Sequence, residues 1–191
     1  MERLHRLLYQ NRAVLKGHFQ LSSGLHSDTY VQCARILQYP WYGEELGQAL
    51  ADQIRAQAEP DCIVSPALGA ILIGYEVARA LQVPFLFTER VNGTMTLRRE
   101  QQIAPGTTCW IVEDVITTGK STREVATVIE QHGGQVLGCA AIIDRRSAEH
   151  ADLPWPCVAL LRMEIATHPP NTCPLCAQGV PLLTPGSRKK G

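Results

Sequence analysis

The sequence predicts an α/β fold with a mostly parallel central sheet flanked by helices. Apolar runs alternate with helical patterns between residues 62 and 143, as expected of strand–helix units. The runs are continuously apolar, which is typical of parallel strands buried on both faces. The pairs Pro60-Asp61 and Gly133-Gly134 end the helical patterns that precede them. In such sheets, ligands bind at the carboxyl ends of the strands.

Two helices and two strands are expected before this region. Leucines at helical spacing predict a helix over residues 2–13, and a face of leucine and isoleucine predicts another over 41–58. Alternating residues at 17–21 and an apolar segment at 29–33 predict two strands on either side of a Ser-Ser-Gly turn.

The strand–helix units then follow one another along the chain. Strands are predicted at 62–64, 83–87, 107–112 and 135–143, and helices at 70–81 and 120–132. A loop at 65–70 joins the first strand to its helix. We expect the chain, residues 1–191, to form a single domain, with the basic tail 184–191 loosely held.

Composition excludes several classes of function. The chain is 45% hydrophobic, which is enough for a sizeable core, and its formal net charge is zero. Zero net charge argues against binding to nucleic acid or to an acidic membrane. No apolar stretch approaches the length needed to cross a bilayer, and the mixed-charge N-terminus lacks a secretory apolar region. We therefore expect a cytoplasmic protein.

Seven cysteines raise the question of metal or disulfide chemistry. Without an export signal, a disulfide framework is not expected. Cys173 and Cys176 form one C-x-x-C pair, but zinc needs two further ligands, and His168 is the only candidate nearby in sequence. The sequence therefore favours no metal here, unless a dimer pools two such pairs. His18 and His26 are expected to be strand or turn residues and not catalytic bases.

One segment carries most of the functional information. The apolar run 109–112 ends in two adjacent acids, Glu113 and Asp114, and the loop Thr117-Thr118-Gly119 precedes a helix. Loop amides, hydroxyls and the helix N-terminus can hold a phosphate. The carboxylates can accept hydrogen bonds from sugar hydroxyls or hold a hydrated cation. The junction therefore predicts a site for a sugar phosphate.

Two other interpretations explain this segment less well. A nucleotide-binding P-loop needs glycine five positions before Gly119, where this chain has Asp114, and a carboxylate there would repel a triphosphate. An ordinary strand-to-helix turn with a capping residue explains one polar side chain, but not two consecutive acids at the end of a strand.

The segment from Ile111 to Ser121 resembles the phosphoribosyl pyrophosphate (PRPP) signature of the type I phosphoribosyltransferases. Four more segments are similar to parts of the orotate phosphoribosyltransferases within that family. Residues 15–27 resemble their N-terminal hood, 65–70 their pyrophosphate loop, 88–99 their mobile catalytic loop, and 141–145 the strand whose arginine contacts orotate. Residues 173–188 resemble the C-terminus of one bacterial branch.

The resemblance implies a fold and a reaction. The fold is the type I phosphoribosyltransferase fold, with a core of about 40–165 and a small hood formed by 15–35 with part of the C-terminal segment. The reaction transfers phosphoribose from PRPP to orotate, giving orotidine 5'-monophosphate and pyrophosphate in pyrimidine biosynthesis. Mg²⁺, held mainly by substrate and water, is the implied cofactor. A homodimer that shares its active-site loop is the implied assembly.

The resemblance also implies a role for individual residues. The catalytic residues would be Glu113, Asp114, Arg98 and Arg99, and the two acids would also be the residues nearest to Mg²⁺. The residues that bind PRPP would be Arg90, Glu113, Asp114, Val115, Ile116, Thr117, Thr118, Gly119, Lys120 and Ser121, with Ala67, Leu68 and Gly69 of the pyrophosphate loop. The residues that bind orotate would be Thr117, Arg145, Ser22 and Ser23.

Three positions depart from the family pattern. Leu68, Thr94 and Ser22 stand where relatives often carry lysine. Positive charge for the pyrophosphate must then come from Arg90, Arg98 and Arg99, or from Lys120. The pair Asn92-Gly93 predicts a hairpin or flap that displays these arginines. These departures leave two alternatives open, namely a phosphoribosyltransferase for another base and a non-catalytic regulator that senses PRPP.

Overall fold

The computed structural model describes residues 2–21, 23–146 and 153–185. Ser22, which we predicted to contact orotate, and residues 186–191 of the predicted tail lie outside the described residues. Among the described helices, none is both long enough and apolar enough to cross a membrane.

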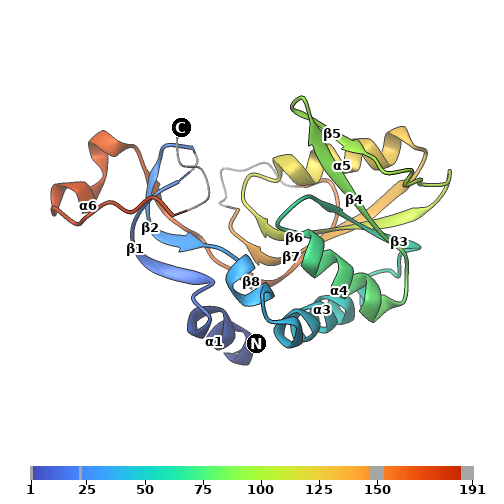
Figure 1. Cartoon of the computed structure of the whole chain (residues 1–191), viewed down its shortest axis with the longest axis horizontal. Coiled ribbons are helices and arrows are strands. Elements are labelled where there is room, and N and C mark those ends of the chain that lie inside the picture. Colours follow the sequence, from blue (N-terminus) through green and yellow to red (C-terminus); the bar gives the residue numbers. More distant parts are fainter. Residues whose placement is uncertain (1, 22, 147–152, 186–191) are drawn as a thin grey trace.

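A six-stranded sheet forms the centre of the molecule (Figure 1). Its strands are β3 (Cys62–Pro66), β4 (Phe85–Val91), β5 (Thr94–Leu97), β6 (Thr108–Ile116), β7 (Gln135–Asp144) and β8 (Cys157–Arg162). In the order β5-β4-β3-β6-β7-β8, every neighbouring pair is parallel except β4 and β5. The predicted mostly parallel sheet is thus confirmed, although the sequence pattern did not predict β8 and indicated β5 only as part of a hairpin at Asn92-Gly93.

The strand β6 shows why the apolar runs are continuous. Trp110 and Val112 pack into the core beneath α3 (Pro40–Arg55) and α4 (Ile71–Leu81). Cys109 and Ile111 pack on the opposite face, beneath α5 (Lys120–Gln131). Because successive side chains of a strand point to opposite faces, a strand covered on both faces must be apolar at every position.

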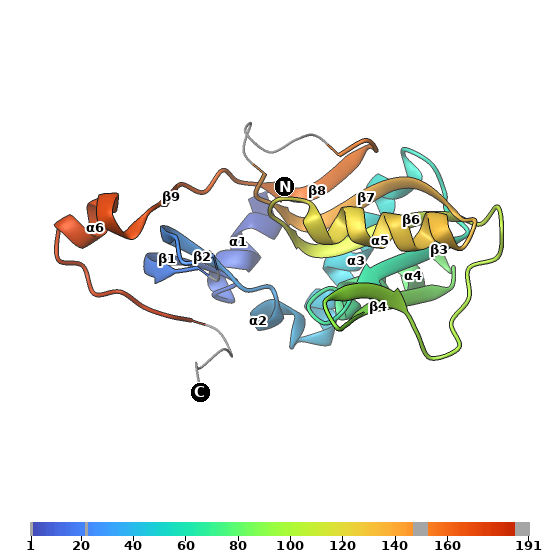
Figure 2. The ribbon, with the colours of Figure 1, turned by 90° about the horizontal axis from the view of Figure 1, so that it is seen from above.

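A second, smaller sheet lies beside the central one (Figure 1). Its three antiparallel strands are β1 (Val14–Gln20), β2 (His26–Val31) and β9 (Thr167–His168), and the helices α1 (Glu2–Gln10) and α2 (Ala34–Leu37) flank them along the chain. Figure 2 shows the chain after β8 running out along this sheet to the short 3₁₀ helix Pro170–Thr172 and to α6 (Pro174–Ala177). Leu183 then forms a bridge with Phe19 of β1.

Several element boundaries differ from the predicted ones, and two of the differences have a local reason. The first helix ends at Gln10 and not at residue 13, because Arg12 takes a left-handed conformation with φ of 56°. The strand expected at 83–87 begins at Phe85, because Gln82 caps α4 with φ of 59°. Such ends cannot be located from hydrophobic spacing alone.

Gly47 allows α3 to approach α4 closely. A Cβ at this position would lie 2.6 Å from Glu76 Cβ and 2.9 Å from the Glu76 carbonyl carbon, which is backbone and cannot swing away. We expect Gly47→Ala to lower the free energy of unfolding by about 2 kcal/mol, in the range measured for overpacked sites. Denaturant melts monitored by circular dichroism would measure the change.

Gly43, one turn earlier on the same buried face of α3, provides the matched control. A Cβ there would meet Glu76 Cγ at 3.6 Å, which is ordinary contact. Gly43→Ala should leave stability unchanged or raise it, because alanine favours helix over glycine by up to about 1 kcal/mol. Equal destabilisation by both variants would contradict the close approach at Gly47.

Candidate active site

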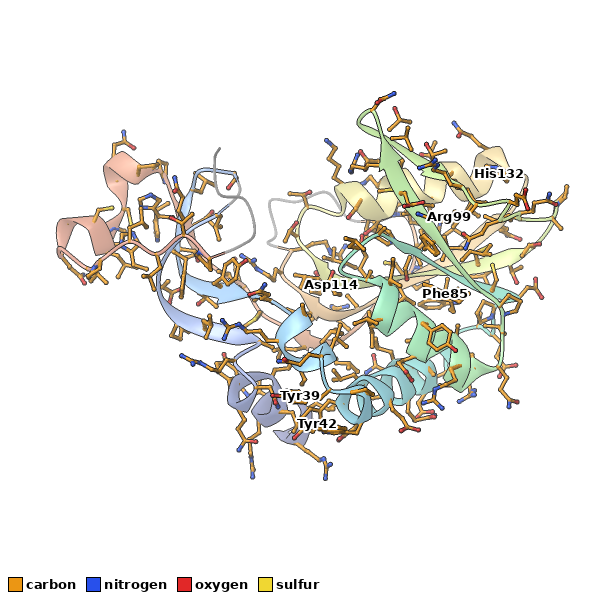
Figure 3. The ribbon with its side chains drawn as sticks, in the orientation of Figure 1. Tyr39, Tyr42, Phe85, Arg99, Asp114 and His132 are labelled. Carbon is orange, nitrogen blue, oxygen red and sulfur yellow. The ribbon has the colours of Figure 1, made fainter. Side chains whose placement is uncertain are left out.

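The carboxyl ends of three neighbouring strands bring the predicted site residues together. The loop 67–70 follows β3, the loop 117–119 follows β6, and Arg145 follows β7. Because the strands are parallel and adjacent in the sheet, these three ends lie at one edge. In Figure 3, Asp114 lies at this edge, on the side of the central sheet that faces the smaller sheet.

The two adjacent acids point to opposite sides of β6 and have different partners. Glu113 is buried, and its Oε1 accepts hydrogen bonds from Ser121 Oγ at 2.6 Å and from Thr122 Oγ1 at 3.3 Å. Asp114 is half-buried and faces Gly69, where an added Cβ would lie 2.7 Å from Asp114 Oδ2. Glu113 therefore braces the first turn of α5, whereas Asp114 faces the loop after β3.

Burial shifts both acids toward their neutral forms. Desolvation raises the pKa of Glu113 to about 8, and the charge of Asp114 adds to the shift, while the Ser121 and Thr122 hydroxyls oppose it. Burial also raises the pKa of Asp114, although backbone amides of Val115 and Asp114 lower it in part. A cation or a positively charged ligand next to the pair would favour the ionised forms.

The loop between β6 and α5 has the form of an anion-binding turn. Thr117 and Thr118 are exposed, and Gly119 takes a left-handed conformation with φ of 72° immediately before α5. The Lys120 amide donates to Thr118 Oγ1 at 3.3 Å, and the Arg123 guanidinium donates to the Thr118 carbonyl at 2.9 Å. The amides of the first turn of α5 and the positive end of its dipole lie at this loop.

Arg123 is a residue that sequence reasoning missed. It lies outside the signature segment, and only its position one turn into α5 could have suggested that its side chain folds back over the loop. Its guanidinium places a positive charge beside Thr118, where the sequence analysis had considered only Lys120 and the hairpin arginines.

The loop after β3 lies against Asp114. The peptide bond between Ala67 and Leu68 is cis, and the Leu68 side chain is 83% exposed. Leu68 thus points to solvent, and Gly69 is the residue of this loop that approaches the acid. A side chain at this position would fit only if the Asp114 carboxylate moved away.

Arg145 is a half-buried cation without a counterion among the described residues. Its Nε is buried and has no hydrogen-bond partner within that part of the chain. Burial lowers the pKa of the Arg145 guanidinium, and Tyr30 of β2 acts in the opposite direction. The neighbouring Asp144 pairs instead with Arg146, through contacts of 2.9 and 3.0 Å. A partly buried guanidinium of this kind can bind an anionic group through charge-assisted hydrogen bonds.

The segment 88–99 forms the hairpin that the Asn92-Gly93 pair predicted. These two residues have φ of 50° and 85°, as a tight hairpin turn between β4 and β5 requires. Arg90 bonds Glu124 of α5 and the Gly93 carbonyl, so it reaches the helix beside the phosphate-binding loop.

The other two hairpin arginines lie at the end of β5. Arg99 bonds Glu89 through contacts of 2.9 and 3.0 Å and covers the ring of Phe87 at 5.9 Å. Arg98 is exposed. In the described part of the chain, neither arginine forms a hydrogen bond or ion pair with Glu113 or Asp114, so their predicted catalytic role stays a prediction. The same holds for Ser23, whose hydroxyl accepts a hydrogen bond from the Leu25 amide in the turn before β2.

Comparison with known proteins places this arrangement in a family. A sequence model of the phosphoribosyl transferase domain matches residues 35–160. Orotate phosphoribosyltransferase from Heliobacterium modesticaldum is 49% identical over 179 residues, which cover 93% of this chain and 93% of the relative. The chain belongs to the orotate phosphoribosyltransferase family.

Further members agree with this assignment. Orotate phosphoribosyltransferase from Carboxydothermus hydrogenoformans is 45% identical over 187 residues, or 97% of each chain. The crystal structure of orotate phosphoribosyltransferase from Aeropyrum pernix matches with a TM-score of 0.63 over 95% of this chain and 91% of that one. At 23% identity, this structure shows the shared fold alone.

The buried acid Glu113 should make stability depend on pH. Its folded-state pKa of about 8 exceeds the ordinary value of 4.5, so between these values the folded protein holds a proton that the unfolded chain has released. The bound proton therefore stabilises the folded protein at low pH, and this stabilisation is lost as pH rises toward 8. The free energy of unfolding should fall by an amount on the order of 3 kcal/mol. Glu113→Gln keeps the hydrogen-bond acceptor without the titration, and it should flatten this fall in urea melts between about pH 5 and 8.

Glu130→Gln, on the exposed side of α5, is the control for this experiment and should retain the pH dependence of the parent protein. An unchanged slope in Glu113→Gln would show that Glu113 is ionised in the folded state across this range.

Gly69→Ala should disturb the acid without unfolding the protein. The added Cβ would displace the Asp114 carboxylate, which is the movable end of a side chain, so the melting temperature should change little. A carboxylate moved by about 1 Å should lower kcat roughly 10- to 100-fold. Turnover assays beside Gly43→Ala would test this, and full activity in Gly69→Ala would mean that the position of Asp114 does not matter.

Proposed function

We propose that the protein transfers the phosphoribosyl group of PRPP to orotate, giving orotidine 5'-monophosphate and pyrophosphate. The observation that carries the choice of base is Arg145, a half-buried guanidinium whose Nε has no partner among the described residues. Its backbone amide donates to the carbonyl of Ile116, directly before the phosphate-binding loop. Orotate differs from uracil by a carboxylate, which such a guanidinium recognises in a bidentate way. The orotate phosphoribosyltransferase relatives support the same choice.

The 5'-phosphate of PRPP fits the loop between β6 and α5. Thr117, Thr118 and the first amides of α5 supply donors there, and Arg123 adds a positive charge beside them. Ser121 has a different part, because its hydroxyl proton is donated to Glu113 and is not available to a phosphate oxygen. We therefore assign Ser121 a positioning role, through Glu113 and α5.

Asp114 is the carboxylate placed to act on the ribose. It is half-buried and faces the loop after β3, so it can accept hydrogen bonds from ribose hydroxyls. As the bond to pyrophosphate breaks, positive character builds on the ribose ring and favours the ionised form of this acid. No nucleophilic side chain is needed, because the orotate nitrogen itself attacks the anomeric carbon. Catalysis then consists of placement and electrostatic stabilisation.

The donor set around the acid pair fits a hydrated magnesium ion. No third histidine, cysteine or acidic side chain joins Glu113 and Asp114 in a ligand cluster within the described part of the chain. Mg²⁺ keeps several waters and binds proteins through one or two carboxylates together with substrate phosphates. When bound, the ion would neutralise charge on the pyrophosphate, and Asp114 would be the side chain that holds it together with substrate and water.

The pyrophosphate end of PRPP requires further positive charge. We propose that Arg90, Arg98 and Arg99 supply it by movement of the β4–β5 hairpin. The pairs of Arg90 with Glu124 and Arg99 with Glu89 are largely exposed, and exposed ion pairs are weak enough to be exchanged for a phosphate partner. Leu68 and Thr94 carry no charge, so these arginines replace the lysines that relatives often use.

A second copy of the chain is the partner that we propose for the outer face of α4. Leu72 and Tyr75 of α4 are 54% and 56% exposed, and Leu68 of the adjoining loop is 83% exposed. An exposed apolar patch of this kind is typical of a protein–protein contact. Its continuity with the loop that faces Asp114 is consistent with a homodimer in which one protomer's hairpin serves its partner's site.

Replacing Arg145 tests the proposed substrate. Arg145→Ala should raise the KM for orotate roughly 10- to 100-fold, because charge-assisted hydrogen bonds contribute about 1.5–3 kcal/mol, while the KM for PRPP changes much less. The KM for orotate of Arg145→Lys should lie between those of the parent protein and Arg145→Ala, since lysine keeps the charge and loses the bidentate geometry. The loss of orotate absorbance, with PRPP and Mg²⁺ present, measures the rate.

Two controls make the result specific. Arg55→Ala, at the far end of α3, should leave both constants unchanged. Uracil lacks the carboxylate, so any slow reaction with uracil should be equal in the parent protein and in Arg145→Ala. An equal rise in both constants would refute the base-binding role of Arg145, and no turnover of orotate by the parent protein would refute the proposed function.

A further inference from the structure

Four side chains with metal-binding atoms meet in the small sheet, away from the acid pair. They are His18 of β1, His26 of β2, and Cys173 and Cys176 at the start of and within α6. One ligand atom from each lies within 4.8 Å of every other. His18, His26 and Cys173 are buried, and Cys176 is exposed. We propose that these residues form a structural zinc site of the Cys₂His₂ type.

The distances between the four atoms match a tetrahedron around zinc. Zn–N bonds of about 2.05 Å and Zn–S bonds of about 2.3 Å require separations of roughly 3.3 Å for N–N and 3.6 Å for N–S. In the structure, His18 Nε2 and His26 Nδ1 are 3.0 Å apart. Cys173 Sγ lies 3.5 Å and Cys176 Sγ 3.7 Å from His18 Nε2, and Cys176 Sγ lies 3.3 Å from His26 Nδ1. Small movements would admit the ion.

A hydrogen bond outside the cluster prepares His18 for metal binding. Its Nδ1 lies 2.8 Å from the carbonyl oxygen of Val180, which can only accept a hydrogen bond. The proton of a neutral His18 ring is therefore on Nδ1, and the Nε2 lone pair points at the other three atoms. Metal-binding histidines commonly have such a backbone partner, which fixes both tautomer and ring orientation.

Charge also favours zinc at this position. The two thiolates carry one negative charge each and the two imidazoles are neutral, so Zn²⁺ cancels the charge of the site. Binding releases the two thiol protons. Without an ion, the lone pairs of two nitrogens and two sulfurs converge in a largely buried space with few protons to share among them. The exposed Cys176 leaves a path by which the ion can enter.

The proposed ion would fasten residues 167–183 to β1 and β2. The ladder of β9 with β2 has only the pairs His26↔His168 and Ser27↔Thr167, and one bridge joins Leu183 to Phe19. No residue of α6 is buried, and only Cys173, which caps this helix, is. A metal that links β1, β2 and α6 would supply the stability that these few contacts lack.

The cluster has other histidines than the sequence suggested. From the sequence, His168 was the only candidate near the two cysteines, whereas the structure places His18 and His26 beside them, and His168 is not among the four. The cysteines are separated from the histidines by about 150 residues of chain, so no local spacing motif joins them.

Metal analysis of the purified full chain tests the proposal without any substrate. Protein produced in zinc-containing medium and freed of loose metal by gel filtration should contain about one zinc per chain. Cys173→Ser and His26→Gln should lower this content about tenfold or more, since loss of a supporting partner alone can cost that much affinity. Cys157→Ser and His168→Gln, which alter a cysteine and a histidine outside the cluster, should keep the zinc of the parent protein.

Cobalt titration guards against variants that fail to fold. Chelator-treated parent protein should take up Co²⁺ with the visible absorption of a tetrahedral ion bound by thiolates, and Zn²⁺ should displace it. Hydrogen exchange of the chelated protein should increase in residues 14–31 and 167–183 and stay constant in the central sheet. A parent protein that holds no zinc and takes up no cobalt would overturn the proposal, as would a disulfide between Cys173 and Cys176, or full zinc retention in Cys173→Ser.

Discussion

The hydrogen bonds from Ser121 and Thr122 to Glu113 join the end of β6 to the first turn of α5, and the geometry of the site depends on this joint. Glu113 is almost fully buried, and burying its carboxyl group without these two donors would lower the stability of the fold. The bonds hold the helix start in a fixed position relative to the strand. They thereby set where the loop amides point and, because neighbouring side chains alternate, where Asp114 points.

Two acids that look equivalent in the sequence thus perform separate tasks. Glu113 lies beneath α5 and stabilises the frame, whereas Asp114 faces Gly69 and the space where a ligand would bind. The alternation of β6 could have predicted this division, since Ile111 and Glu113 must share one face, and that face is covered by the following helix. The signature by itself indicates only that both acids are present.

The sequence predicted what depends on local pattern, including the parallel strands, the signature loop and the hairpin at Asn92-Gly93. It could not predict contacts between distant segments. That Arg145 lacks the neighbouring acid as a partner follows only from the structure, in which Asp144 pairs with Arg146 and Tyr30 of the small sheet lies near Arg145. The four-residue cluster in the small sheet depends on a strand near one end of the chain meeting a helix near the other. Periodicity reports which face of an element is buried and does not report which element covers it.

The pairing of both ends of the chain in one small sheet has a consequence for biosynthesis. Residues 167–183 complete a sheet that begins at Val14, so this sheet can be finished only after these later residues have emerged from the ribosome. The central sheet ends at Arg162 and does not need to wait. Domains usually fold as their residues appear during translation. The framework that carries the acids would therefore assemble first, and the layer that contributes Tyr30 would close over it last.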